Sequence, residues 1–329
     1  MTEQEKTIIV TGGSGFIGTA LCKLLVEAGH NVINIDRKKK DIEGVTLYPF
    51  DIDNHQVKGI IQLVRPDAII HLAADHEVGR SMVDPGIYYA NNVANTINLL
   101  NCAVEAGVKE FIYSSSSSVY GDTDVVPTPE KHPREPQSPY ARTKHMVEQI
   151  LEDYRKAYDF NYVSLRYFNA AGAIPDMSHG YTQDPATHLV PILCRKAISG
   201  ETLTINGSDY DSTADGTAAR DYTHVCDIAS AHLAALNYLH DTESSDVFNI
   251  GAGGSTTVLE MVAALADCDV TETALTTVLG PRRDGDVAQT CADVTKAKEL
   301  LGWEAQYSLN DILEHAYAWE MKNTKRKKS

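Results

Sequence analysis

Three residues have the types and spacing needed for proton transfer. Tyr140 and Lys144 are four positions apart, so a helix would place both on one face. The phenol, with an ordinary pKa of about 10, is a poor base at neutral pH, but a nearby ammonium favours its charged form. Ser116, in a run of serines after an apolar strand, could hydrogen-bond a reacting hydroxyl and Tyr140. We therefore expect general acid–base chemistry.

A glycine-rich turn lies upstream, between an apolar run and a helical pattern. In that context Gly12 permits a tight turn, Gly15 lets the backbone approach a pyrophosphate, and Gly18 allows close packing of the helix. The motif predicts a dinucleotide site, and NAD is the cofactor expected there. The residues expected to contact NAD from this turn are Gly12, Gly15, Phe16, Ile17 and Gly18.

Asp36 ends the second predicted strand, where the dinucleotide fingerprint requires an acidic residue. Its carboxylate is expected to accept hydrogen bonds from the adenosine ribose and to repel a 2′-phosphate, which favours NAD over NADP. The basic run from Arg37 to Lys40 could hold that phosphate instead. Asp51 and Ile52 follow the third predicted strand and are placed to flank the adenine, or to form an ordinary strand end.

Apolar runs alternate with helical patterns along the chain, which predicts an α/β fold with a doubly wound parallel sheet of the Rossmann type. We expect an NAD-binding domain over residues 1–168, with residues 221–250 returning to it. Residues 169–329 otherwise form a smaller, interleaved C-terminal lobe for the substrate. The main runs are strands at 68–72, 110–113, 162–165 and 247–250, and helices at 95–106, 141–158, 188–199 and 225–239.

The composition narrows the range of partners. A net charge of −16 argues against nucleic-acid binding, which requires a basic face. Six well-separated cysteines without a Cys-x-x-Cys pair indicate neither a disulfide framework nor a metal site. No apolar run approaches the roughly 18 residues needed to span a membrane. These features favour a cytoplasmic protein with no membrane partner.

The motifs together resemble the extended short-chain dehydrogenase/reductase family. The resemblance rests on the glycine turn, the serines before Val119-Tyr120-Gly121, and Tyr140-x-x-x-Lys144. It narrows downstream, where Arg166-Tyr167-Phe168-Asn169, Asp215-Gly216-Thr217 and Arg220-Asp221-Tyr222 are similar to the UDP-glucose 4-epimerase branch. The resemblance extends in register from about Thr7 to Trp319.

The resemblance implies roles for individual residues. Ser116, Tyr140 and Lys144 would be catalytic. Further contacts to NAD would come from Leu72, Ala73, Ala74, Asn92, Ser114, Tyr140, Lys144 and Tyr167. A UDP-sugar would be held by Ser116, Asn169, His188, Leu189, Asn206, Arg220, Tyr222, Val258, Arg283, Asp286 and Thr290. Two arginines suit a diphosphate, whereas Arg282 is better explained as a surface ion pair.

The activity implied is NAD-dependent epimerisation of a UDP-hexose at C4 through a transient 4-ketose. UDP-glucose and UDP-galactose are the expected substrates, and a small Thr290 beside the sugar leaves room for N-acetylhexosamines. UDP-uronic acids or UDP-pentoses are alternatives. A 4,6-dehydratase is disfavoured because Ser117 and Ser118 replace its Asp and Glu, and a non-catalytic sensor because Tyr140 and Lys144 are present. The resemblance also implies a homodimer through helices 95–106 and 146–158.

Overall fold

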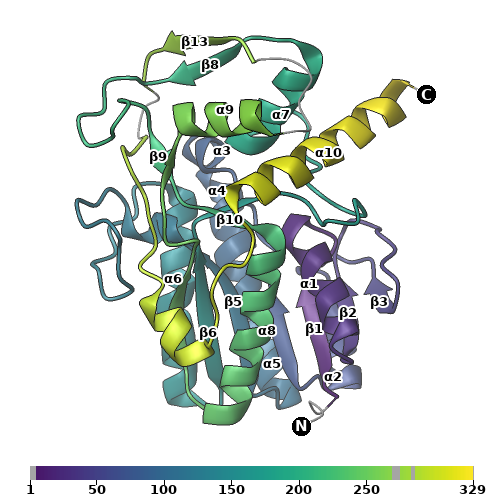
Figure 1. The fold of residues 1–329 in the computed structure, drawn as a ribbon. Coiled ribbons are helices and arrows are strands. Elements are labelled where there is room, and N and C mark those ends of the chain that lie inside the picture. The colour runs from purple at the N-terminus through teal and green to yellow at the C-terminus, as the bar shows by residue number, and fades with distance from the viewer. Residues whose placement is uncertain (1–4, 269–274, 283–285, 329) are drawn as a thin grey trace.

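The computed structural model describes residues 5–268, 275–282 and 286–328. Within them, seven strands form a parallel sheet in the order β11-β6-β5-β4-β1-β2-β3 (Figure 1). Their bounds are β1 Thr7–Thr11, β2 Asn31–Ile35, β3 Val45–Tyr48, β4 Ala68–His71, β5 Glu110–Ser116, β6 Asn161–Tyr167 and β11 Asp246–Ile250. The predicted doubly wound parallel sheet is confirmed.

Helices cover both faces of this sheet because its strands are apolar on both sides. Ile8 and Val10 face one core, which α1 and α8 close, while Ile9 faces a second core closed by α2, α5 and α6. The sheet is therefore buried between two layers of helices. The bounds are α1 Phe16–Glu27, α2 Gln56–Val64, α5 Asn95–Ala106, α6 Pro139–Ala157 and α8 Val225–Thr242.

A third core lies in the upper part of Figure 1, beyond the carboxyl ends of the sheet strands. It is built around Leu193, Met261 and Leu313, one from each of three packed helices. This core belongs to the smaller lobe. Its main elements are α7 Leu189–Ser199, α9 Val258–Asp267, α10 Leu309–Lys328 and the parallel pair β8 Leu203–Asn206 and β13 Thr277–Gly280.

The chain crosses between the two parts more than once. After the first residues of the smaller lobe, α8 and β11 return to the sheet, where β11 pairs with β6. The chain returns again later, since Ala297 and Trp303 pack in the core against α8, and the Trp303 indole donates to Ser230 Oγ at 2.8 Å. The two parts are therefore interleaved along the sequence.

Short elements connect these layers. They are α3 Val78–Val83, α4 Pro85–Tyr88, the π-helical η1 Tyr89–Ala94, the 3₁₀ turn η2 Ser117–Tyr120, β7 Asn169–Ala171, β9 Ala219–Arg220, β10 Tyr222–His224, β12 Thr256–Thr257 and the π-helical η3 Ala297–Leu301. None of the helices in the described part of the chain is long and apolar enough to cross a membrane.

The order of the strands indicates which edge of the sheet would bind a ligand. Strand β1 has β2 on one side and β4 on the other, so the connections leave in opposite directions at this point. In open α/β sheets, ligands bind at the carboxyl ends of the strands beside such a switch. Gly12 follows β1, Leu72 follows β4, and Ser116 ends β5, so these predicted site residues lie along one edge.

Candidate active site

The glycine turn after β1 forms a cradle in which side chains would not fit. Gly12 has φ +79°, and a Cβ built on it would lie 2.7 Å from the Ala73 nitrogen. Gly15 is the N-cap of α1, and among the described residues no side chain caps that helix start. This geometry suits the pyrophosphate of a dinucleotide, because helix N-termini favour anions.

Asp36 lies beside this turn. Its two carboxylate oxygens accept hydrogen bonds from the Ser14 nitrogen at 3.0 Å and the Lys38 nitrogen at 2.7 Å. A carboxylate offers about four lone-pair sites, so room remains for ribose hydroxyls. Arg37, considered above for a 2′-phosphate, faces Asp51 at 3.4 Å and Asp75 at 3.9 Å. Its pairing with carboxylates favours NAD over NADP.

Ser116 and Tyr140 meet where β5 faces the start of α6. The helix begins at Pro139, and its N-cap is Ser138, whose side chain accepts from the Ala141 nitrogen. Ser116 Oγ accepts from the Ser118 hydroxyl at 2.9 Å, so its own proton is directed elsewhere. Its interaction with the Tyr140 hydroxyl opposes the rise in the pKa of Tyr140. The two hydroxyls are therefore close enough to influence each other.

Lys144 lies one turn further along α6 and is buried. Its Nζ donates to the Ser114 carbonyl at 2.6 Å and lies 5.0 Å from the centre of the Tyr113 ring. The Tyr140 ring centre is 5.8 Å from the same Nζ. The ammonium is therefore held between the helix and the strand, next to the phenol that it is expected to influence.

Burial dominates the protonation of both groups. It raises the pKa of Tyr140 to about 12 and lowers the pKa of Lys144 to about 7. The chain alone therefore does not lower the pKa of Tyr140, because loss of solvent outweighs the hydrogen bond from Ser116. The lowering expected from the sequence included the positive nicotinamide ring as well as Lys144.

Two residues predicted at the nicotinamide make contacts within the protein. The Asn92 amide donates to the Asp75 carbonyl at 2.9 Å and to Thr143 Oγ1 at 3.2 Å, which ties the loop after β4 to α6. The Tyr167 hydroxyl lies 2.5 Å from His232 Nε2. Both side chains are buried, so their proposed effect on the cofactor includes bracing the walls of its site.

The predicted substrate residues form a second group around β9, β10 and β7. Arg220 is ion-paired with Asp286 and donates to the Val287 carbonyl at 2.7 Å. The sequence favoured a diphosphate contact over an ion pair for this arginine; the structure places it in an ion pair with another predicted substrate residue. Arg282, by contrast, pairs with Asp209 at 2.7 Å, as expected.

The remaining predicted substrate residues surround this pair or lie on the neighbouring helix. Asn169 pairs in register with Tyr222, the Val258 nitrogen donates to Ala218, and the Thr290 nitrogen donates to Ala219. His188 is the N-cap of α7, before Leu189, and its ring centre lies 6.0 Å from that of His76. Asn206 ends β8. Arg283 lies outside the described residues.

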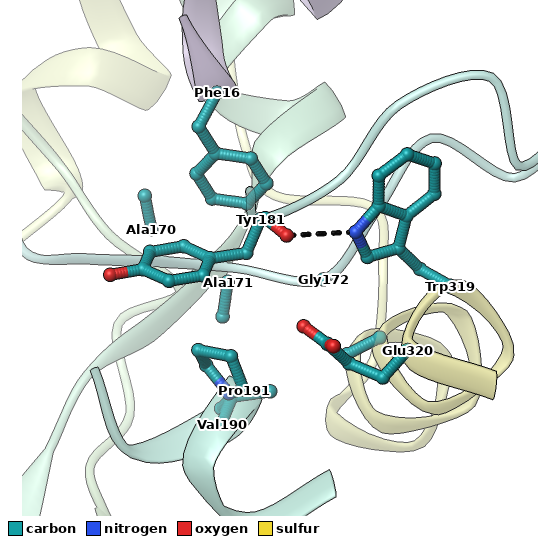
Figure 2. A pocket seen from close by; sticks show the side chains of 10 residues that line it. Phe16, Ala170, Ala171, Gly172, Tyr181, Val190, Pro191, Trp319 and Glu320 are labelled. Carbon is teal, nitrogen blue, oxygen red and sulfur yellow. Dashed lines mark hydrogen bonds between the residues drawn. The ribbon is translucent and has the colours of Figure 1, made fainter. Parts of the chain in front are cut away.

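A small cavity lies where α1, α7 and α10 meet. Phe16, Tyr181 and Trp319 line it, and the Trp319 indole donates to the Tyr181 carbonyl at 2.8 Å (Figure 2). Glu320 also reaches it. Tyr140, Lys144 and Ser116 are not among its lining residues, so this cavity is separate from the acid–base group.

Sequence reasoning missed a buried ion pair beside the acid–base group. Glu148 accepts hydrogen bonds from Arg166 at 2.9 and 2.7 Å. The available signal was spacing, because Glu148 is four positions after Lys144 on the same helix face. Arg166 could not be matched to it from spacing, since the two lie on different elements.

The glycine turn, Asp36 and the group of Ser116, Tyr140 and Lys144 together define a class of protein. It is the class of nucleotide-binding proteins with dehydrogenase-type acid–base chemistry. Comparison with known proteins narrows that class. The model of the NAD dependent epimerase/dehydratase family matches residues 8–251, about three-quarters of the chain. The chain belongs to this family.

Similar proteins are found over nearly the whole length. The UDP-glucose 4-epimerase of Rhizobium meliloti is 38% identical over 322 residues, 96% of this chain and 97% of the relative. That of Halalkalibacterium halodurans is 39% identical, covering 95% of each chain. A Stenotrophomonas maltophila UDP-glucose-4-epimerase, solved with NAD and formylated UDP-arabinopyranose, is 33% identical with a TM-score of 0.93; the match covers 98% of this chain and 100% of that one.

Proposed function

We propose that this protein is an NAD-dependent UDP-sugar 4-epimerase that interconverts UDP-glucose and UDP-galactose. The observation that carries the proposal is the meeting of Ser116, Tyr140 and Lys144 beside the glycine turn, at the strand edge where a dinucleotide binds. Near full-length similarity to UDP-glucose 4-epimerases supports the choice of reaction.

The residues present fit the cofactor. Gly12 lets the turn pack against the Ala73 backbone, Gly15 is the N-cap of the helix whose start would hold a pyrophosphate, and Asp36 accepts from the Ser14 nitrogen of the same turn. When bound, NAD takes up a hydride from the sugar and returns it, so the cofactor is regenerated in each cycle. It should therefore remain bound through purification.

The chain's own contribution is to move one proton. Tyr140 removes the proton from the 4-hydroxyl as the ketose forms, and returns it when the hydroxyl is restored. Ser116, whose oxygen accepts from Ser118, lies beside Tyr140 and would hydrogen-bond the same sugar hydroxyl. Lys144 holds positive charge beside the phenol, which stabilises the phenolate. The cycle is symmetrical, so the same three side chains serve both directions.

Substrate binding must combine a firm hold on the nucleotide with a loose hold on the sugar, because the ketose has to turn over between the two hydride transfers. We assign the firm part to Arg220, Arg283 and Asp286, with Asn169 and Tyr222 nearby. For Arg220 this requires exchange of its ion pair with Asp286 for the diphosphate. Thr290 is assigned to the sugar end, where its small side chain leaves room for a 2-acetamido group.

A pentose substrate is the second candidate, favoured by one observation. The Stenotrophomonas maltophila enzyme of this fold was solved with a formylated UDP-arabinopyranose. UDP-hexoses, UDP-N-acetylhexosamines, UDP-pentoses and UDP-uronic acids should therefore be assayed side by side in both directions. The hexoses are expected to give the largest kcat/KM.

The experiment that tests the proposed function uses the purified chain without added cofactor. UDP-galactose is supplied, and UDP-glucose formation is followed by NMR. Conversion to the equilibrium mixture is expected. Absence of conversion, both without and with added NAD, would exclude the function.

We also propose that the protein is a cytoplasmic homodimer in which α5 and α6 of two copies form a four-helix contact. Met146 on α6 and Tyr158, which follows that helix, are large apolar residues that are 38% and 49% exposed. Light scattering coupled to size-exclusion chromatography should give twice the chain mass, and Met146→Glu should shift the mass toward that of one chain.

A further inference from the structure

Three consecutive serines of β5 are each tied to α6, at three positions one turn apart. Ser116 interacts with Tyr140 and opposes the rise in its pKa, the Ser114 carbonyl accepts from Lys144 at 2.6 Å, and the Ser115 hydroxyl donates to Glu148 at 2.6 Å. The first two ties involve the proposed catalytic groups. The third contact, between Ser115 and Glu148, has no part in the proposed reaction, although it joins the same strand and helix.

Glu148 is an unusual residue to bury, since it is only 7% exposed. Arg166, 2% exposed, donates to both of its carboxylate oxygens, at 2.9 and 2.7 Å. Arg166 is itself fixed, because it donates to the Tyr120 hydroxyl at 2.8 Å and to the Glu130 carbonyl at 3.0 Å. The carboxylate is thus clamped by residues of β5 and β6, which holds this turn of α6 against the two strands.

Such a buried pair adds little net stability, since desolvation of two charges offsets their attraction. Packed apolar side chains would fill the same space at no electrostatic cost. A role beside the reacting groups accounts better for its position, one turn from Lys144. Burial opposes the charged form of Glu148, but the hydrogen bonds from Arg166 lower its pKa to about 2, so the carboxylate stays negative.

Other groups around the Lys144 ammonium provide little compensating negative charge. From β5 it meets the Tyr113 ring and the Ser114 carbonyl, and from α6 the Tyr140 ring. His71 and His76 face it from β4 and the following loop, and both have lowered pKa values, first through burial. His145 lies 4.0 Å from Glu148 on the same helix. Glu148 is the group whose charge favours protonated Lys144.

We infer that Glu148, clamped by Arg166 and Ser115, is a positioning residue for the epimerase reaction. It holds α6 in register with the serines of β5, and its negative charge favours the protonated form of Lys144 beside Tyr140. The inference rests on the proposed function, because the charge on Lys144 matters only if Tyr140 acts as the base.

The test is Glu148→Gln, assayed for UDP-galactose conversion across pH. Without the carboxylate, Lys144 loses its proton at lower pH, so the alkaline limb of kcat should move down by about one pH unit. At neutral pH, kcat should fall about tenfold with KM for the UDP-sugar nearly unchanged. Glu148→Asp retains the negative charge, so the alkaline limb of its kcat profile should stay at the wild-type pH. Its kcat should fall severalfold.

Glu320→Gln is the matched control. Glu320 is 4% exposed and accepts from Arg195 at 2.9 and 3.1 Å, but it lies on α10 in the smaller lobe. Its loss should lower the melting temperature without moving the alkaline limb. If the alkaline limb of kcat in Glu148→Gln lies at the same pH as in the wild type, the inference is overturned. If that variant does not fold, full kcat in Glu148→Asp would overturn it. Wild-type conversion in the same assay establishes the proposed function separately.

Discussion

Tyr140 lies in surroundings that oppose its use as a base until the site is filled. Burial raises its pKa to about 12, and the Ser116 hydrogen bond offsets only part of that rise. The phenol is therefore protonated in the chain alone.

Replacing Tyr140 by Phe removes the hydroxyl that exchanges the proton. The kcat for UDP-galactose is expected to fall about 10³-fold, a typical contribution of general acid–base catalysis, while the melting temperature changes little. Tyr154→Phe is the control on the same helix, since the Tyr154 hydroxyl bonds to Asn101 away from the site. Equal activity of both variants would remove Tyr140 from the mechanism.

Sequence alone could bring Ser116, Tyr140 and Lys144 together, because helical spacing and strand position fix their direction. It could not predict that Arg220 meets Asp286, 66 positions away, or that Arg166 meets Glu148. Such pairs depend on how separate elements pack. Periodicity within an element carries no information about them.

Among the elements, the turn between β1 and α1 has the tightest steric demand. Alanine at Gly12 would be strained by φ +79° and would press on the Ala73 nitrogen. Gly29 has φ +87° but no atom within 4 Å of a built Cβ, so Gly29→Ala isolates the backbone strain, about 1–2 kcal/mol.

Gly12→Ala is therefore expected to lose more unfolding free energy than Gly29→Ala, and to retain less NAD on purification. Urea denaturation and the absorbance of released cofactor measure the two effects. Comparable stability and cofactor content in the two variants would show that the cradle at Gly12 is not needed.

Element boundaries followed the sequence where a pattern was regular. The predicted helix at 95–106 matches α5, and the predicted strand at 68–72 matches β4 to within one residue. The sequence did not predict that residues 89–94 are π-helical, because their pattern is that of an ordinary helix that continues into α5. The later return of Ala297 and Trp303 to the first core was also missed, because short apolar segments do not reveal which core they join.

At the scale of the whole molecule, buried histidines make the fold sensitive to acid. Burial lowers the pKa of His71 to about 3, and those of His224 and His232 to about 4. These rings are neutral in the folded chain and protonate at about pH 6.5 when unfolded. The unfolded state then binds more protons, so stability is full above pH 6.5 and falls as the pH drops toward 4.

Urea denaturation at pH 7.5, 6 and 5 should therefore show an unfolding free energy that decreases below pH 6.5, by up to about 1.4 kcal/mol per pH unit for each such histidine. His232→Gln should reduce that slope. A flat profile between pH 7.5 and 5 would contradict neutral burial of these rings.

The most direct test of the central claim follows the hydrogen at C4 of the sugar. UDP-galactose carrying deuterium at C4 is converted in ordinary water, and the product is analysed by NMR. Transfer to a bound cofactor and back predicts UDP-glucose with deuterium still at C4. Loss of the deuterium to water, or its retention only in unconverted UDP-galactose, would contradict the mechanism.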